Sequence, residues 1–174
     1  MRRKIFTYAI IAISSILALG CEKISSDGKV ELYLLDSYKT VREHSCQIDE
    51  TTVKTKANPL ISYDDFISYD PITHEFLISD KAAKAIINDT EKSVDLIAFA
   101  VKADGEIVYT GYFWPLYLSS TCDWVYIDPI LTSFDNKMEV CLGYPGPMPG
   151  QAIPDKRNDS RIIEIFKRDH KLVE

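Results

Sequence analysis

Two apolar runs separated by a short polar stretch, Leu96–Val101 and Ile107–Phe113, constrain the fold of this chain more than any other feature. Asp104-Gly105 stands between them, and two-residue hairpin turns favour this pair because both central positions need positive φ angles. Taking these two residues as the turn fixes the register of the strands. The facing pairs are then Val101–Val108, Phe99–Thr110, Ile97–Tyr112, Ala100–Tyr109, Ala98–Gly111 and Leu96–Phe113. Both faces are largely apolar, which predicts a hairpin in the middle of a sheet with a helix on one side.

Shorter patterns predict the elements around this hairpin. Alternating apolar residues predict strands, and apolar residues three and four apart behind a capping residue predict helices. The expected strands are Val30–Tyr38, Thr73–Ile78 and a second hairpin in which Trp124–Ile127 returns as Lys137–Leu142; the expected helices are Lys81–Asn88, a turn at Tyr63–Ile67 and a last helix that ends at Arg168. Helices interspersed with antiparallel hairpins predict one α+β domain over residues 30–174. Its mixed or antiparallel sheet has the Asp-Gly hairpin at the centre and two or three short helices on one face.

The first 20 residues have the composition of a secretory signal peptide. Arg2, Arg3 and Lys4 precede an apolar run that ends at Gly20, and Cys21 follows. This run is shorter than the roughly 20 apolar residues that cross a bilayer. Leu17-Ala18-Leu19-Gly20-Cys21 resembles the lipobox of bacterial lipoproteins, with Ala18 at the position where leucine is commonest. The resemblance implies cleavage before Cys21, fatty chains on Cys21, and residues 21–29 as a tether between the lipid and the domain.

The charge of the chain bears on its partners. Residues 1–20 carry three basic and no acidic residues, so without them the formal charge falls from −6 to −9. Nucleic-acid binding calls for clustered Lys and Arg, so we expect no nucleic-acid partner. The same negative net charge disfavours electrostatic binding of the protein surface to anionic lipid headgroups. The expected membrane contact is therefore the lipid on Cys21, in the cell membrane or the outer membrane, with the domain outside the cytoplasm.

Three cysteines remain once Cys21 carries lipid. An exported chain meets an oxidising compartment, which favours one disulfide. Cys122 and Cys141 flank the second predicted hairpin at about equal distances from its middle, so we predict a bridge between them. Cys46 would then be a buried free thiol or an intermolecular one. The alternative is three free thiols.

No constellation of residues predicts catalysis, a cofactor or a metal ion. The acidic residues between Asp64 and Asp80 lack the ligand spacing of a calcium loop. His44-x-Cys46 is a single loose pair, whereas zinc sites show a close pair twice. The segment Ser119–Asp123 contains serine, threonine and cysteine, which can act as nucleophiles, next to an aspartate. It has no nucleophile-elbow motif and no histidine nearby in the sequence, so it does not predict a hydrolase site.

Aromatic residues crowd the segment from Tyr109 to Tyr126. Most of them can be core residues. Exposed ones could stack on a sugar ring or anchor a protein partner, because they provide large contact area at low entropic cost. Trp114, Tyr117 and Trp124 lie at strand ends and in the loop, so they are the candidate binding patch.

Two further segments, Ile67–Ile78 and Asp104–Trp114, together with Asp155–Arg161, resemble small exported bacterial proteins of no assigned function. The order strand, helix, hairpin is also similar to a periplasmic head domain of the Sec translocase, a likeness that carries over no functional residue. The sequence therefore predicts a lipid-anchored envelope lipoprotein with a non-catalytic binding domain for an envelope protein or a glycan. The alternatives are an envelope hydrolase with a dispersed active site and a purely structural envelope component.

Overall fold

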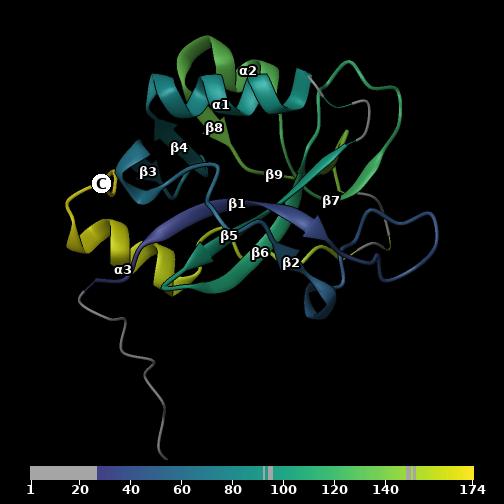
Figure 1. Cartoon of the computed structure of the whole chain (residues 1–174), viewed down its shortest axis with the longest axis horizontal. Helices are drawn as coiled ribbons and strands as arrows, with labels where there is room; N and C mark the ends of the chain where they lie inside the picture. Colours follow the sequence, from purple (N-terminus) through teal and green to yellow (C-terminus); the bar gives the residue numbers. More distant parts are fainter. Residues whose placement is uncertain (1–26, 92, 94–95, 148–149, 151) are drawn as a thin grey trace, which may run out of the picture.

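Two β-sheets and three α-helices form the part of the chain that the computed structural model describes, residues 27–91, 93, 96–147, 150 and 152–174. This is the single α+β domain that the sequence predicts (Figure 1). The expected signal peptide, Cys21 and most of the tether lie outside the described residues. Gly28 and Lys29 already belong to the domain, because their carbonyl oxygens accept hydrogen bonds from Arg168 at 2.7 Å and from the Asp104 amide at 2.9 Å.

The larger sheet has six strands in the order β2-β1-β5-β6-β7-β9. It is mixed, because β6 and β7 run parallel while the other neighbours are antiparallel. Its strands are β1 (Val30–Ser37), β2 (Lys54–Thr55), β5 (Ile97–Ala103), β6 (Glu106–Phe113), β7 (Cys122–Ile127) and β9 (Cys141–Tyr144). β5 and β6 lie at the centre, which explains why both of their faces are apolar.

The register of β5 and β6 differs from the predicted one beyond the turn. Asp104 and Gly105 adopt φ angles of 52° and 83°, and Ala103 lies opposite Glu106. A bulge between Val101 and Lys102 then shifts the pairing by one residue, so Phe99 lies opposite Gly111 and not opposite Thr110. A one-residue shift exchanges the faces of a strand. The ring of Phe99 therefore covers the one residue of β6 that has no side chain.

A second sheet, which the sequence pattern did not predict, contains three antiparallel strands in the order β3-β4-β8. The strands are β3 (Phe66–Asp70), β4 (Glu75–Ile78) and β8 (Lys137–Glu139). The predicted hairpin of 124–127 with 137–142 is corrected here. α2 follows β7, β8 joins the smaller sheet, and the chain passes at Val140 into β9, which pairs with β7. Residues 137–144 thus connect the two sheets.

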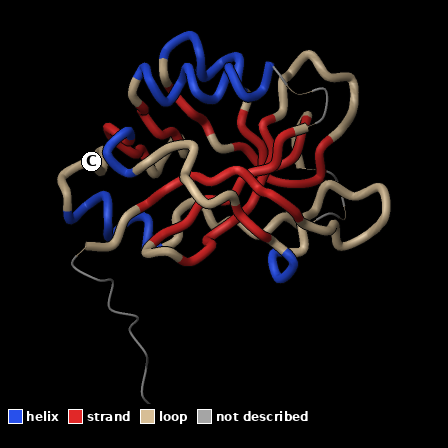
Figure 2. The backbone as a smooth tube through the Cα atoms, viewed as in Figure 1, coloured by secondary structure: helices blue, strands red, loops and turns tan. Residues whose placement is uncertain are grey.

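The helices are α1 (Asp80–Glu91), α2 (Pro129–Asp135) and α3 (Ser160–Arg168), and single 3-10 turns occur at Glu50–Thr52 and Tyr63–Asp65. α1 and α2 lie side by side at the top of Figure 1, while α3 lies apart from them near the start of β1. Figure 2 shows the same arrangement, with the strands crossing the middle of the molecule. The amphipathic patterns that predicted α1 and α3 are confirmed, since Ala83 and Ile86 of α1 and Ile162 and Phe166 of α3 are buried.

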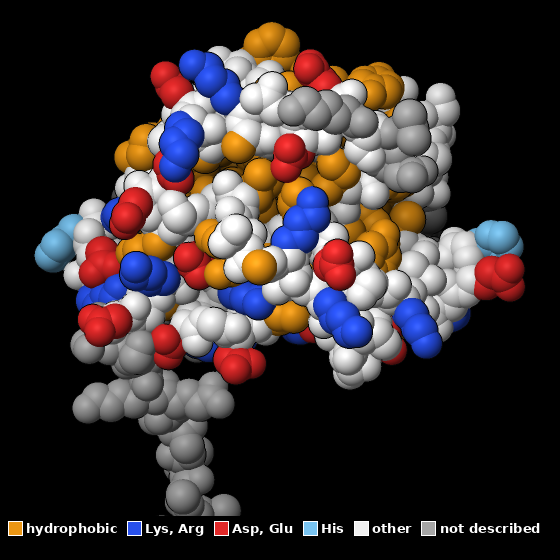
Figure 3. All heavy atoms as spheres, in the orientation of Figure 1, with side chains coloured by type: hydrophobic (Ala, Val, Ile, Leu, Met, Phe, Trp, Pro, Cys, Tyr) orange, Lys and Arg blue, Asp and Glu red, His pale blue; other side chains and the backbone are white. Residues whose placement is uncertain are grey.

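The core is continuous between the two sheets and α3. Phe166 of α3 packs edge-on or tilted against Phe66, Tyr69 and Phe76 of the smaller sheet, with ring centroids 5.6–6.0 Å apart. Aromatic pairs prefer such geometries, which add to the gain from burial. On the face seen in Figure 3, hydrophobic side chains gather in a hollow beside α1, and charged side chains surround it.

Candidate functional site

The predicted aromatic patch does not form, because two of its three residues belong to the core. Trp114 is 2% and Trp124 is 8% exposed, and only Tyr117, at 73%, is on the surface. The indole Nε1 of Trp124 donates a hydrogen bond of 3.1 Å to Thr110 Oγ1 inside the sheet. Trp114 is held where β6 ends, since its amide donates to the Ile127 carbonyl oxygen at 2.8 Å. Trp124 is part of β7, an inner strand of the larger sheet between β6 and β9, which explains its burial.

The predicted Cys122–Cys141 disulfide is also corrected. Both are free thiols, as is Cys46. In the pairing of β7 with β9, Cys122 lies opposite Tyr144, whereas Cys141 lies opposite Tyr126. Four residues of strand span about 13 Å, and a disulfide needs Cα atoms closer than about 7 Å. The helix between the two strands removes the symmetric hairpin on which the prediction depended.

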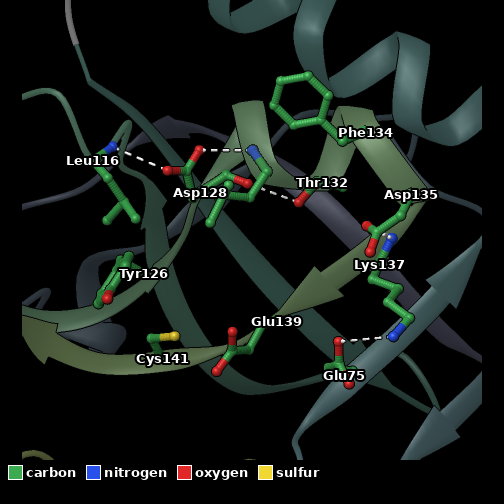
Figure 4. A pocket seen from close by; sticks show the side chains of 11 residues that line it. Glu75, Leu116, Tyr126, Asp128, Thr132, Phe134, Asp135, Lys137, Glu139 and Cys141 are labelled. Carbon is green, nitrogen blue, oxygen red and sulfur yellow. Dashed lines mark hydrogen bonds and ion pairs between the residues drawn. The ribbon is translucent and has the colours of Figure 1, made fainter.

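The best-defined pocket lies where the two sheets meet beneath α2 (Figure 4). Its volume is about 290 Å³. It combines residues from β4, β7, β8, β9, α2 and the loop after β6. The lining residues are Glu75, Leu116, Tyr126, Asp128, Leu131, Thr132, Phe134, Asp135, Lys137, Glu139 and Cys141.

Asp128 fixes the roof of this pocket. Its side chain caps α2 by accepting hydrogen bonds from the amides of Ile130 at 2.7 Å and Leu131 at 3.1 Å. The second carboxylate oxygen accepts from the Leu116 amide at 3.0 Å, so the loop after β6 is held against the start of α2. Tyr144 adds a hydrogen bond of 3.0 Å to the carbonyl oxygen of Leu116. The Asp128 carboxylate is therefore used for structure and is not available to a ligand.

Two glutamates of the pocket lining lie opposite each other in the smaller sheet. Glu75 of β4 lies directly opposite Glu139 of β8, and both side chains line the pocket. Like charges directly opposite each other in an antiparallel pair destabilise a sheet. Lys137 approaches Glu75 at 3.8 Å with 53% of its side chain exposed, which is a weak compensation. Among the described residues no Lys or Arg forms an ion pair with Glu139, which Figure 4 shows between Glu75 and Cys141.

The negative charge of Glu139 acts on its neighbours. Burial, and then the charge of the Glu139 carboxylate, raise the pKa of the Cys141 thiol to about 11. Burial also raises the pKa of the Tyr126 hydroxyl, with a further contribution from Cys141 and Glu139. Both groups stay protonated at neutral pH. The pocket therefore presents hydrogen-bond donors and carboxylates, and the only cation on its lining is Lys137.

The remaining wall of the pocket is apolar and partly open to solvent. Leu131 and Phe134, on the first and second turns of α2, are 52% and 79% exposed, and Leu116 is 37% exposed. Phe134 also borders a neighbouring hollow of about 410 Å³ between α1 and α2. An exposed phenylalanine between two hollows, in a pocket that also contains the Glu139 carboxylate, is an arrangement suited to contact with another molecule.

The other polar segments identified in the sequence do not form a site among the described residues. The Asp123 carboxylate accepts hydrogen bonds from the Cys46 amide at 2.6 Å and from Ser45 Oγ at 3.0 Å, which is a structural role. In the part of the chain that the structure describes, no group of three or more His, Cys, Asp and Glu residues is placed to hold a metal ion. Over the same residues, no helix is both long and apolar enough to span a membrane.

No protein-family model, no curated protein and no solved structure matches this chain. The chemistry of the site itself is therefore the basis for its function.

Sequence reasoning missed this pocket because it missed α2. The signal was present in Asp128-Pro129, since aspartate is a favoured N-cap and proline is favoured at the first position of a helix. Asn136, with a φ angle of 61°, ends the helix in the left-handed conformation. No local pattern predicts that Glu75 and Glu139 lie opposite each other, because these residues are 64 positions apart in the sequence.

Proposed function

We propose that this chain is a lipid-anchored envelope protein whose domain binds a basic side chain of a partner protein in the pocket beneath α2, without catalysis. The observation that carries the proposal is the facing of Glu75 and Glu139 on the floor of that pocket. A bound ammonium or guanidinium group between the two carboxylates would relieve their repulsion. It would also form charge-assisted hydrogen bonds, which are about twice as strong as neutral ones.

The size and the walls of the pocket favour a side chain over a larger small molecule. Pockets for drug-sized ligands range from about 300 to 1,000 Å³, and this one is at the lower limit with about 290 Å³. The apolar stem of a Lys or Arg side chain can lie along Leu131 and Leu116 while its charged end reaches the carboxylates. Phe134, on the exposed wall of the pocket, then offers an apolar contact to the residues next to the basic one. The formal charge of −9 that remains without residues 1–20 favours a basic partner as well.

A glycan is a poorer match to this surface. Sugar rings stack on exposed aromatic side chains, and the two tryptophans that could serve this purpose are in the core. Tyr117 remains exposed, but it borders a different hollow, one lined by residues of β5 and of the loop after β6. A protein partner uses both the carboxylates and Phe134, so it accounts for more of the surface.

The hydrolase alternative finds little support in the pocket. Cys141 is the only thiol on its lining, and the raised pKa keeps this thiol protonated, whereas a nucleophilic cysteine needs a lowered pKa. No histidine is among the lining residues to serve as a base. Binding without catalysis is therefore the proposal that fits these side chains.

The anchor part of the proposal depends on the N-terminal sequence. A basic head, an apolar run and Cys21 are the features of a lipoprotein signal. Cys21→Ser is expected to move the protein from the membrane fraction to the soluble fraction, and mass spectrometry of the wild-type N-terminus is expected to find fatty chains on Cys21. A native N-terminus at Met1 would overturn this part and leave the binding proposal intact.

Binding is tested with three probes added to the purified full chain at low ionic strength. The probes are the peptides acetyl-Leu-Lys-Leu-amide and acetyl-Leu-Gln-Leu-amide, and free butylamine. We expect the lysine peptide to bind with a Kd of about 1 mM and to shift the amide NMR signals of Tyr126 and Cys141. Added salt is expected to weaken this binding. Equal binding of butylamine would indicate a small amine as the ligand. Equal binding of both peptides would overturn the proposal.

The variant Glu139→Gln removes one of the two carboxylates while it keeps the size of the side chain. We expect this substitution to raise the Kd of the lysine peptide at least ~5-fold, which corresponds to the loss of about 1 kcal/mol of binding free energy. Glu164→Gln is the matched control, because Glu164 is exposed on α3 and does not line the pocket. A similar effect of the two substitutions would show that only net charge matters and that the pocket is not the site.

A further inference from the structure

The thiols of Cys46 and Cys122 lie against each other, although 75 residues separate them in the sequence. Cys46 is in the loop after β1, and Cys122 is the first residue of β7. The two side chains interact with each other, and the Cys122 thiol donates a hydrogen bond of 3.8 Å to the carbonyl oxygen of Trp124. Cys122 belongs to the buried core, and Cys46 packs against that core as a partly buried side chain.

The backbone holds the two cysteines in this arrangement. The Asp123 carboxylate accepts hydrogen bonds from the Cys46 amide at 2.6 Å and from the Ser45 hydroxyl at 3.0 Å. Asp123 directly follows Cys122, so the residue next to one cysteine holds the backbone of the other. The Ser45 hydroxyl also accepts from the Gln47 amide at 3.0 Å, which completes a turn around Cys46.

We propose that Cys46 and Cys122 form the disulfide of this protein when it meets an oxidising compartment, and that Cys141 stays a free thiol. The pairing differs from the Cys122–Cys141 bridge that the sequence predicts. It rests on the export that the proposed function includes, because the bridge needs an oxidising compartment. Its geometry is independent of the pocket beneath α2, so failure of the binding proposal leaves it intact.

The two thiols differ in the way that disulfide exchange requires. The interaction with the Cys122 side chain lowers the pKa of Cys46, while the same interaction and burial raise the pKa of Cys122. Cys46 is therefore the thiolate that attacks. Cys46 is half-buried and Cys122 fully buried, and the neighbouring side chains of Glu43 and His44 are 90% and 91% exposed. An oxidant can reach Cys46 from this loop.

The oxidant is a protein or small molecule that itself carries a reducible disulfide. The Cys46 thiolate attacks one sulfur of that disulfide, a mixed disulfide forms, and the other sulfur leaves as a thiolate. Cys122 then gives up its proton and attacks Cys46 Sγ, which releases the second thiol of the oxidant. The two cysteines lose two electrons and two protons in total, and the oxidant becomes two thiols.

The test is a peptide map of the full chain after incubation with oxidised glutathione, followed by alkylation and tryptic digestion without reduction. The three cysteines fall in three different tryptic peptides, residues 43–54, 103–137 and 138–156. We expect a cross-linked pair of 43–54 with 103–137 and an alkylated 138–156. A cross-link to 138–156, or alkylation of both Cys46 and Cys122, would overturn the proposal.

Variants give a second readout that does not depend on cross-linked peptides. Cys122→Ser is expected to trap glutathione on Cys46, because the second thiol is missing. Cys141→Ser is the control and is expected to form the bridge as the wild type does. The bridge closes a loop of more than 70 residues, so reduction is expected to lower the wild-type Tm by about 10 °C. No change of Tm on reduction of the oxidised wild type would contradict the bridge.

Discussion

Phe99 covers Gly111 across the central pair of strands, and the two residues are matched in size. A β carbon at Gly111 would lie 2.6 Å from Cζ of the Phe99 ring and 2.8 Å from the carbonyl oxygen of Val125. Real β carbons essentially never come so close to another atom. The absence of a side chain at this position is what allows β5, β6 and β7 to pack as they do.

Gly111→Ala is therefore expected to destabilise the protein by about 1–3 kcal/mol, the usual cost of overpacking a core. Urea denaturation followed by tryptophan fluorescence measures it. Part of the loss should be recovered in Gly111→Ala combined with Phe99→Leu, because the shorter side chain removes the contact with the ring. Additive effects of the two substitutions would show that the ring is not the obstacle.

Glu139→Gln is expected to stabilise the free protein while it weakens binding. The substitution removes the repulsion from Glu75 on the opposite strand, which is worth roughly 0.2–1 kcal/mol. Thermal unfolding at low ionic strength measures the gain, and salt is expected to reduce it. Glu164→Gln on α3 should leave the Tm unchanged. Destabilisation by Glu139→Gln would mean that Glu139 has a favourable partner and would count against a site that awaits a cation.

Acid is expected to weaken the contact between Asp155 and Arg157. Bidentate hydrogen bonds of 2.9 and 2.7 Å from Arg157 lower the pKa of Asp155 to about 2. A carboxylate whose pKa is lowered on folding stabilises the protein above its unfolded pKa of about 4, and this contribution is lost as the pH falls through about 2. The Asp155 side chain is 47% exposed, so solvent screening limits the contribution to about 1 kcal/mol.

The comparison is the free energy of unfolding of wild type and Asp155→Asn between pH 5 and pH 2. We expect the wild type to lose more stability over this range than the variant does. Asp36→Asn, an exposed position in β1, is the control and should follow the wild type. Parallel curves for wild type and Asp155→Asn would show that the ion pair does not contribute.

The local sequence accounts for a large part of the fold. Alternation in Val30, Leu32 and Leu34 placed their side chains in the core, and the stripes of α1 and α3 indicated their buried faces. These features depend on neighbours within one or two turns or strand positions, so a pattern of a few residues is sufficient to predict them. The apolar faces of β5 and β6 placed that pair inside a sheet for the same reason.

Tertiary structure decided the rest, because the deciding contacts join residues far apart in the chain. Phe99 lies opposite Gly111 because of the bulge between Val101 and Lys102. The alternation of apolar residues along the two strands does not reveal this bulge. α2 and the passage at Val140 separate Cys122 from Cys141, while Asp123 brings Cys46 to Cys122. The sequence by itself determined the strands β1, β4, β5, β6 and β7 and the helices α1 and α3, and it predicted an anchor at Cys21. Only the packing of the two sheets beneath α2 determined which tryptophans are buried, which cysteines meet and where two carboxylates face each other.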